Sequence, residues 1–141
     1  MSTDSTTFAF VCVQNAGRSQ MSTAFAERER ERRDLDDSVE ILTGGTHPAE
    51  DVHEEVVDVM GEEGFDLSDR TPREVSTAEL ESCDVVATMG CSTLELDAES
   101  VDVRDWALDD PDGQDMDQVR EIRDDIEQRV VALFDEFHPD D

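Results

Sequence analysis

A cysteine, an arginine and a serine lie close together near the start of this 141-residue chain, at a spacing that suits nucleophilic chemistry on an anion. Cys12 is followed after five residues by Arg18 and then by Ser19. A thiolate is the reactive form of cysteine, and a nearby arginine favours that form and also attracts an oxyanion. We therefore expect Cys12 to be ionised at neutral pH and to attack a bound tetrahedral oxyanion.

The segments on either side of this loop are predicted to position it. Residues 8–13 form an apolar, β-branched run typical of a buried strand, and residues 19–34 have helix-forming composition with Ser19 as the expected N-cap. Unpaired backbone N–H groups and the helix dipole at such a junction favour an anion. The predicted anion-binding loop comprises Val13, Gln14, Asn15, Ala16, Gly17, Arg18 and Ser19.

Strands and helices are predicted to alternate along the rest of the chain. Further strands are expected at 39–43 (closed by Gly44 and Gly45), 84–89 and 101–106, and helices at 48–63, 77–82 and from Val119 to Phe137. This alternation is typical of a parallel sheet covered on both faces. We expect an α/β fold: one three-layer domain over residues 1–141, with a four-stranded parallel sheet and helices on both faces.

Catalytic side chains of such a sheet are expected beyond the carboxyl ends of its strands. Cys12 ends the first strand, Cys91 follows the third, and Asp110 lies a few residues beyond the fourth, so all three are predicted to converge. Cys83 lies at the start of the third strand, roughly 20 Å from that edge at about 3.3 Å per residue, and is expected to be structural.

The composition limits which binding partners and which cellular compartment we expect. The net charge is −28, and all eleven basic residues are arginine. Such a polyanion is expected to bind neither nucleic acid nor a membrane, and we predict a halophilic protein whose charge keeps it in solution in brine. An odd number of cysteines and the lack of a leader or spanning segment predict a reduced, cytoplasmic protein, expected to be a monomer. The three histidines do not cluster, so no metal is expected.

Two groups of arginines are expected to be structural. Arg70 and Arg73 flank Pro72 and are predicted to pair with nearby acidic residues. The alternating run at 27–33 places opposite charges at helical spacing, which is typical of a solvated helix face.

Four segments together carry a resemblance to a known family: Val11–Met21, Gly44–Pro48, Thr88–Cys91 and Trp106–Pro111. They resemble the low-molecular-weight tyrosine phosphatase superfamily, and more closely its arsenate reductase branch, over nearly the whole length of the chain. The resemblance implies the same fold and an anion-binding loop at the first segment.

The resemblance also implies roles for single residues. Cys12 would be the nucleophile, Arg18 the oxyanion clamp, Ser19 a hydrogen-bond partner of the thiolate, and Asn15 the residue that holds the loop in shape. Asp110, immediately before a proline, would be the general acid, with the adjacent Asp109 as the weaker candidate.

The resemblance allows two reactions that share a first step. Cys91 resembles the first resolving cysteine of thioredoxin-linked arsenate reductases, but residues 92–105 contain no second one. Either a Cys12–Cys91 disulfide is opened by an external thioredoxin- or glutaredoxin-like protein, or a low-molecular-weight thiol resolves the adduct. The alternative is a phosphatase, in which water hydrolyses a Cys12-phosphate. The absence of tyrosine, and Asp112-Gly113 after Pro111, favour a small oxyanion over a phosphotyrosyl ring. No bound cofactor is expected.

The charge generates a first prediction. Salt screens repulsion between carboxylates, and the Debye length falls to roughly 3 Å at molar concentrations. The melting temperature should therefore rise between dilute buffer and multimolar KCl. A melting temperature that stays constant or falls over that range would contradict the halophilic interpretation.

Overall fold

Four parallel strands form the sheet in this computed structural model, which describes residues 6–12, 15, 17–35, 38–45, 48–89, 102–106 and 115–137. The strands lie in the order β2-β1-β3-β4, and each neighbouring pair is parallel. Their bounds are β1 (Thr6–Cys12), β2 (Val39–Gly45), β3 (Val85–Met89) and β4 (Asp102–Asp105). The predicted four-stranded parallel α/β sheet is confirmed.

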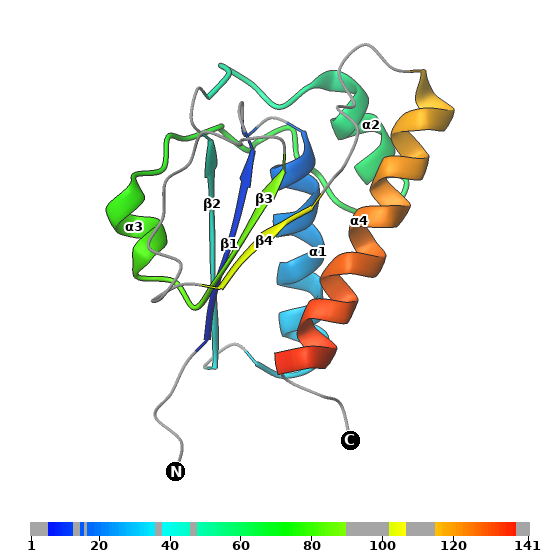
Figure 1. Ribbon diagram of the computed structural model, residues 1–141. Coiled ribbons are helices and arrows are strands. Elements are labelled where there is room, and N and C mark those ends of the chain that lie inside the picture. Colours follow the sequence, from blue (N-terminus) through cyan, green and yellow to red (C-terminus); the bar gives the residue numbers. More distant parts are fainter. Residues whose placement is uncertain are drawn as a thin grey trace.

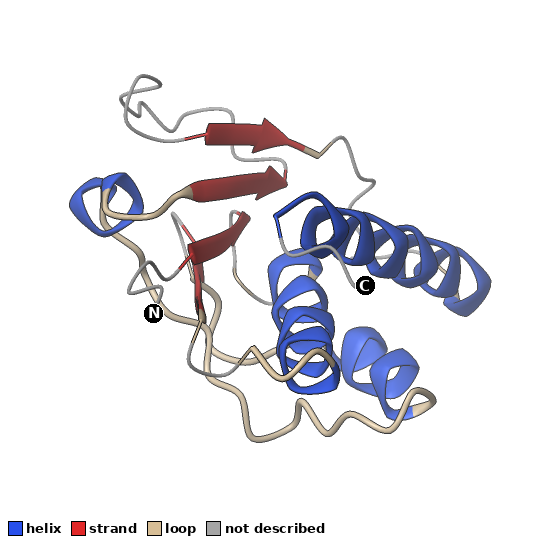
Figure 2. Cartoon of the chain, turned by 90° about the horizontal axis from the view of Figure 1, so that it is seen from below, coloured by secondary structure: helices blue, strands red, loops and turns tan. Residues whose placement is uncertain are grey.

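Helices cover the two faces of the sheet unequally (Figures 1 and 2). Three of them pack on one face: α1 (Arg18–Arg32), α2 (Glu54–Gly61) and the long α4 (Met116–Phe137). The short α3 (Thr77–Glu81) lies on the opposite face. The three predicted layers are therefore present, with most of the helical cover on one side.

The side chains of β1 alternate between these two layers, as the pleat of a strand requires. Phe8, Phe10 and Cys12 belong to the large core beneath α1, α2 and α4. Ala9 and Val11 belong to a smaller core beneath α3. The last β1 side chain on the α1 face is thus the predicted nucleophile.

The register of the sheet brings several strand ends to one edge. Cys12 pairs with Gly45 of β2 on one side and with Met89 of β3 on the other. We call this edge, where the carboxyl ends of β1, β2 and β3 meet, the rim. Helix α1 also begins at the rim, in the upper part of Figure 1. The rim therefore combines a strand end with a helix N-terminus, as predicted.

Two predicted boundaries are wrong. Helix α2 begins at Glu54 and not at Pro48. The buried Val52 stands four residues before Val56, which imitates helical spacing, although it lies in the non-helical segment that precedes the helix. Strand β2 continues through Gly44 and Gly45, because both pair with β1 and Gly45 also forms a bridge with Glu74.

The charged run on α1 is also not the solvated face that its alternating signs predict. Glu29 is 5% exposed and forms ion pairs with Arg32 and Arg33. Arg28 lies over the rings of Phe25 and Phe65. The guanidinium groups have flat, weakly hydrated faces that pack on aromatic rings, so they are accommodated near the core.

Acidic and basic side chains also connect separate helices. Arg28 on α1 pairs with Glu127 on α4 at 2.5 Å. Arg120 and Arg123 on α4 both bind Glu62, the residue that follows α2. These hydrogen bonds, from Arg120 first and then Arg123, lower the pKa of Glu62 to about 2. The arginines therefore join the three helices of the crowded face.

The close approach of Gly44 to Val75 generates a second prediction. A Cβ on Gly44 would lie 2.5 Å from the Val75 Cβ and 3.2 Å from its backbone nitrogen. Gly44→Ala should therefore destabilise the fold by about 1–3 kcal/mol, as overpacking does. Gly61→Ala is the control, because a Cβ there meets nothing within 4 Å. Denaturant unfolding in molar KCl should separate the two variants; equal stability would contradict the packing at Gly44.

Candidate active site

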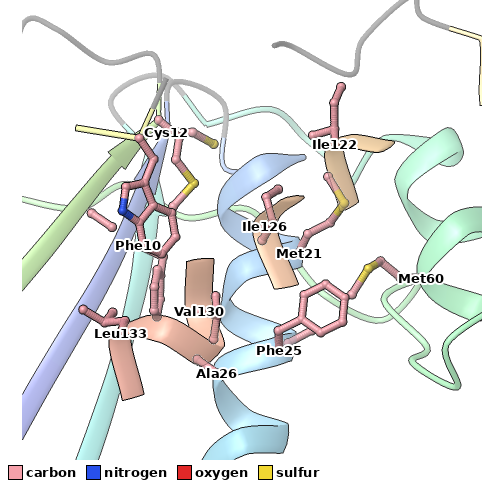
Figure 3. Close-up of a cluster of buried hydrophobic side chains, with 14 of the residues drawn as sticks. Phe10, Cys12, Met21, Phe25, Ala26, Met60, Ile122, Ile126, Val130 and Leu133 are labelled. Carbon is pink, nitrogen blue, oxygen red and sulfur yellow. The ribbon is translucent and has the colours of Figure 1, made fainter. Parts of the chain in front are cut away.

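Two polar groups approach the sulfur of Cys12. The backbone N–H of Asn15 donates a hydrogen bond to Cys12 Sγ at 3.2 Å, and Ser19 Oγ lies 2.9 Å from the same sulfur. The side chain is buried, beside Phe10 among the packed residues between β1, α1 and α4 (Figure 3). These contacts hold the sulfur at the carboxyl end of β1, in a position that suits a nucleophile.

Asn15 and Cys12 both contact the Ser19 hydroxyl. Asn15 Nδ2 donates to Ser19 Oγ at 2.8 Å, so the serine oxygen is an acceptor on that side. Its own hydrogen is then available for Cys12 Sγ.

Ser19 is not the N-cap that its position predicted. Gly17 is the N-cap, α1 starts at Arg18, and no side chain caps the helix. The predicted contact between Ser19 and the sulfur is present.

The amide of Asn15 uses its whole hydrogen-bonding capacity. Nδ2 donates to Ser19 Oγ and to Thr43 Oγ1, at 2.8 and 2.9 Å. Oδ1 accepts from Gln20 Nε2 and from the backbone N–H of Arg73, at 3.1 and 3.0 Å. The residue is fully buried and has a φ of 52°, in the left-handed region that asparagine tolerates better than most residues.

A segment around Arg73 fastens the loop to β2. The backbone of Arg73 accepts from Gly45 N–H at 2.9 Å, while Val75 N–H donates back to Gly45 at 3.2 Å. The guanidinium donates to the Thr43 carbonyl and pairs with Glu79. Arg70 pairs with Glu27. The predicted pairing of Arg70 and Arg73 with acids is therefore correct.

Three contributors to the site were not predicted from the sequence: Thr43, Gln20 and the backbone of Arg73. Thr43 had a usable signal, because it lies near the carboxyl end of β2, which neighbours β1. Its hydroxyl accepts from Asn15 and donates to the Phe10 carbonyl at 3.1 Å. The sequence carries no signal for the Arg73 amide, because every residue except proline has a backbone N–H that can donate.

Of the other residues named from the sequence, the structure describes Arg18 and Cys83 but not Cys91 or Asp110. Arg18 is the first residue of α1, at the helix N-terminus, and the first turn contains no acidic residue that would repel an anion. Cys83 precedes β3 at the end opposite Met89, is buried, and has its thiol pKa raised by burial and by the charge of Asp84. Cys91, Asp110 and three loop positions, Val13, Gln14 and Ala16, lie outside the described residues.

Within the described ranges, no three His, Cys, Asp or Glu side chains gather as metal ligands would. None of the helices in those ranges combines the length and apolar character that a bilayer crossing requires.

Comparison with known proteins identifies the family of this chain. The model of the low molecular weight phosphotyrosine protein phosphatase family matches residues 7–140. This chain belongs to that family. The match includes the Cys12–Ser19 loop and α4.

Relatives within the family carry arsenate reductase names. The chain is 89% identical over the full length of both chains to a Halobacterium salinarum protein provisionally named an arsenate reductase. It is 32% identical to the glutaredoxin arsenate reductase of a Synechocystis species, over 89% of this chain and 93% of the relative. A solved arsenate reductase in a phosphate-binding state is 28% identical, with a TM-score of 0.78 over 93% of this chain and 98% of that one. The Halobacterium relative confirms the halophilic interpretation of the charge.

The saturated amide of Asn15 generates a third prediction. Asn15→Asp keeps the size and tolerates the backbone conformation, but a carboxylate cannot donate to Ser19 or Thr43 and adds negative charge near Cys12. Alkylation of Cys12 by iodoacetamide should slow by on the order of tenfold or more, since one orphaned buried polar group has a cost of that size. Peptide mass spectrometry distinguishes Cys12 from the other thiols.

Asp34→Asn is the matched control, because Asp34 also has a positive φ, of 56°, but is exposed. It should leave the alkylation rate unchanged. Equal rates for Asn15→Asp and wild type would contradict the role assigned to the amide.

Proposed function

We propose that this chain is a thiol-dependent arsenate reductase in which Cys12 is the nucleophile. The observation that carries the proposal is the sulfur of Cys12 beside the N-terminus of α1, with Ser19 and the Asn15 amide as hydrogen-bond partners. This arrangement suits a thiolate that meets a tetrahedral oxyanion. The arsenate reductase names of the relatives at 89% and 32% identity support arsenate as that oxyanion.

In the first step the Cys12 thiolate attacks arsenic. A sulfur–arsenic bond forms, and one arsenate oxygen leaves as water after it takes a proton from Asp110. Arg18 and the loop N–H groups hold the other oxygens. Arsenic is not reduced in this step, and it remains As(V) in the adduct.

In the second step a thiolate attacks Cys12 Sγ. We assign this attack to Cys91, with a low-molecular-weight thiol as the other candidate. The sulfur–arsenic bond breaks, its electron pair stays on arsenic, and arsenite, As(III), is released. Two sulfurs are oxidised to a disulfide as arsenic gains two electrons. A thioredoxin- or glutaredoxin-like protein, or a small thiol, then supplies two electrons to restore the thiols.

A phosphatase is the second candidate, because the family model that matches the chain describes phosphotyrosine phosphatases. Its first step is the same attack by Cys12, on phosphorus. It differs in the second step, where water hydrolyses the Cys12-phosphate and no electrons move. The fate of the adduct therefore separates the two candidates.

The proposal predicts different losses for two cysteine variants in molar KCl. Cys91→Ser should lose redoxin-coupled arsenate reduction by at least about a hundredfold, because the adduct then lacks its resolving thiol. Cys83→Ser is the control: Cys83 Sγ donates to the Glu79 carbonyl, a bond that a serine hydroxyl can keep. Arsenite release is measured with a redoxin and, separately, with a small thiol, alongside hydrolysis of an aryl phosphate.

Each outcome assigns the second step. Loss of arsenite release in Cys91→Ser with the redoxin, but not with the small thiol, supports Cys91 as the resolving residue. Equal activity of Cys91→Ser and wild type under both conditions, with the redoxin and with the small thiol, assigns that step to the external thiol. Rapid aryl phosphate hydrolysis with no arsenite from wild type under either condition overturns the reductase.

A further inference from the structure

Gln20 is a buried polar residue for which the proposed reaction has no role. It is the third residue of α1, is 2% exposed, and lies beneath the anion-binding loop. Its Nε2 donates to the Asn15 carbonyl at 3.0 Å and to Asn15 Oδ1 at 3.1 Å. Helical side chains lean toward the N-terminus of their helix, so the third residue of α1 can reach back to the loop that precedes it.

The orientation of the Gln20 amide is fixed by its neighbours. The Arg73 N–H donates to Asn15 Oδ1, which identifies that atom as the oxygen of the Asn15 amide. A reversed Gln20 amide would place Oε1 against that oxygen and the Asn15 carbonyl, two acceptors. The observed orientation instead leaves Oε1 buried and without a partner among the described residues. Both bonds to Asn15 are thus kept although Oε1 finds no partner among the described residues, where a buried oxygen without one is costly.

We propose that Gln20 is a positioning residue for anion capture: its amide holds the backbone and the side chain of Asn15, so that Asn15 and Ser19 present their hydrogens to the Cys12 sulfur. This inference rests on the proposed function only through its first step, which the reductase and the phosphatase share. Gln20 touches neither Cys12 nor the anion; it acts through Asn15.

The chain of contacts has a direction. Gln20 and the Arg73 amide hold Oδ1, which aims Nδ2 at Ser19 and Thr43. Ser19 Oγ then lies 2.9 Å from the Cys12 sulfur, within reach for its hydrogen, while the Asn15 N–H donates to the same atom. Without Gln20, Oδ1 keeps the Arg73 N–H, but the Asn15 carbonyl loses the Gln20 donor. The expected defect is in the loop and not in the core.

Two substitutions test this role. Gln20→Met keeps the length and removes the donor. Gln20→Glu keeps the shape, and its carboxyl can donate to Asn15 only when it is protonated. Gln128→Glu, at an exposed position on α4, is the control for the added charge. Inorganic phosphate is the probe, and its dissociation constant is taken from its protection of Cys12 against iodoacetamide at pH 5 to 8. Each value is divided by that of wild type at the same pH, which removes the titration of phosphate and of the other site groups.

The expected results differ between the variants. Gln20→Met should weaken phosphate binding by about tenfold or more at every pH. Burial at this position raises the pKa of a carboxyl, so Gln20→Glu should bind within a few-fold of wild type at pH 5 and lose on the order of tenfold by pH 8, while Gln128→Glu follows wild type throughout. A purely structural role would lower thermal stability without this pH-dependent ratio.

Two results would overturn the inference. One is phosphate binding by Gln20→Met within twofold of wild type. The other is a ratio of dissociation constants, Gln20→Glu to wild type, that is constant with pH. This second result overturns the inference even if Gln20→Met does not fold. Failure of the proposed function has a separate signature. Wild type would then bind phosphate and both Gln20 variants would behave as expected, but no arsenite would form.

Discussion

The predicted anion-binding loop depends on one residue held in a left-handed conformation, Asn15. Its side-chain amide joins α1, β2 and the segment around Arg73, and its backbone N–H reaches the Cys12 sulfur. Four hydrogen bonds saturate a group that is wholly buried, so no water or alternative partner competes for it. Asn15, which the proposed reaction needs as a hydrogen-bond donor to the Cys12 sulfur, is thereby held in place before any anion arrives, and such preorganisation favours catalysis.

A chain of net charge −28 must still attract an anion, and its charges are distributed accordingly. The first turn of α1 carries no acidic residue and begins with Arg18, so the helix dipole is not opposed where the oxyanion is expected. Elsewhere arginines pair with carboxylates between elements, as Arg28 does with Glu127 across α1 and α4. Salt screens the distant carboxylates more than the groups in contact with the sulfur. A halophilic surface and an anion site are therefore compatible in one small domain.

The sequence was sufficient to predict the sheet, the order of its elements and the place of Cys12 at the end of β1, because apolar periodicity and strand-to-helix alternation are local signals. Ser19 was predicted as a cap, since its type favours N-caps, but its hydroxyl is used by the sulfur and by Asn15. The start of α2 was misplaced because Val52 imitates helical spacing. Gln20 and the Arg73 amide could not be predicted, because their roles depend on contacts with Asn15 across the fold. Cys91 and Asp110 remain predictions from the sequence and the family resemblance.

The central claim is that Cys12 passes its arsenic adduct to Cys91 and not to water. A single turnover of the fully reduced protein with arsenate, in molar KCl and without any added reductant, tests it most directly. The account predicts arsenite stoichiometric with the protein and a disulfide between the peptides of Cys12 and Cys91, identified by mass spectrometry. Arsenate recovered unchanged, with Cys12 and Cys91 both still free to react with iodoacetamide, would contradict it.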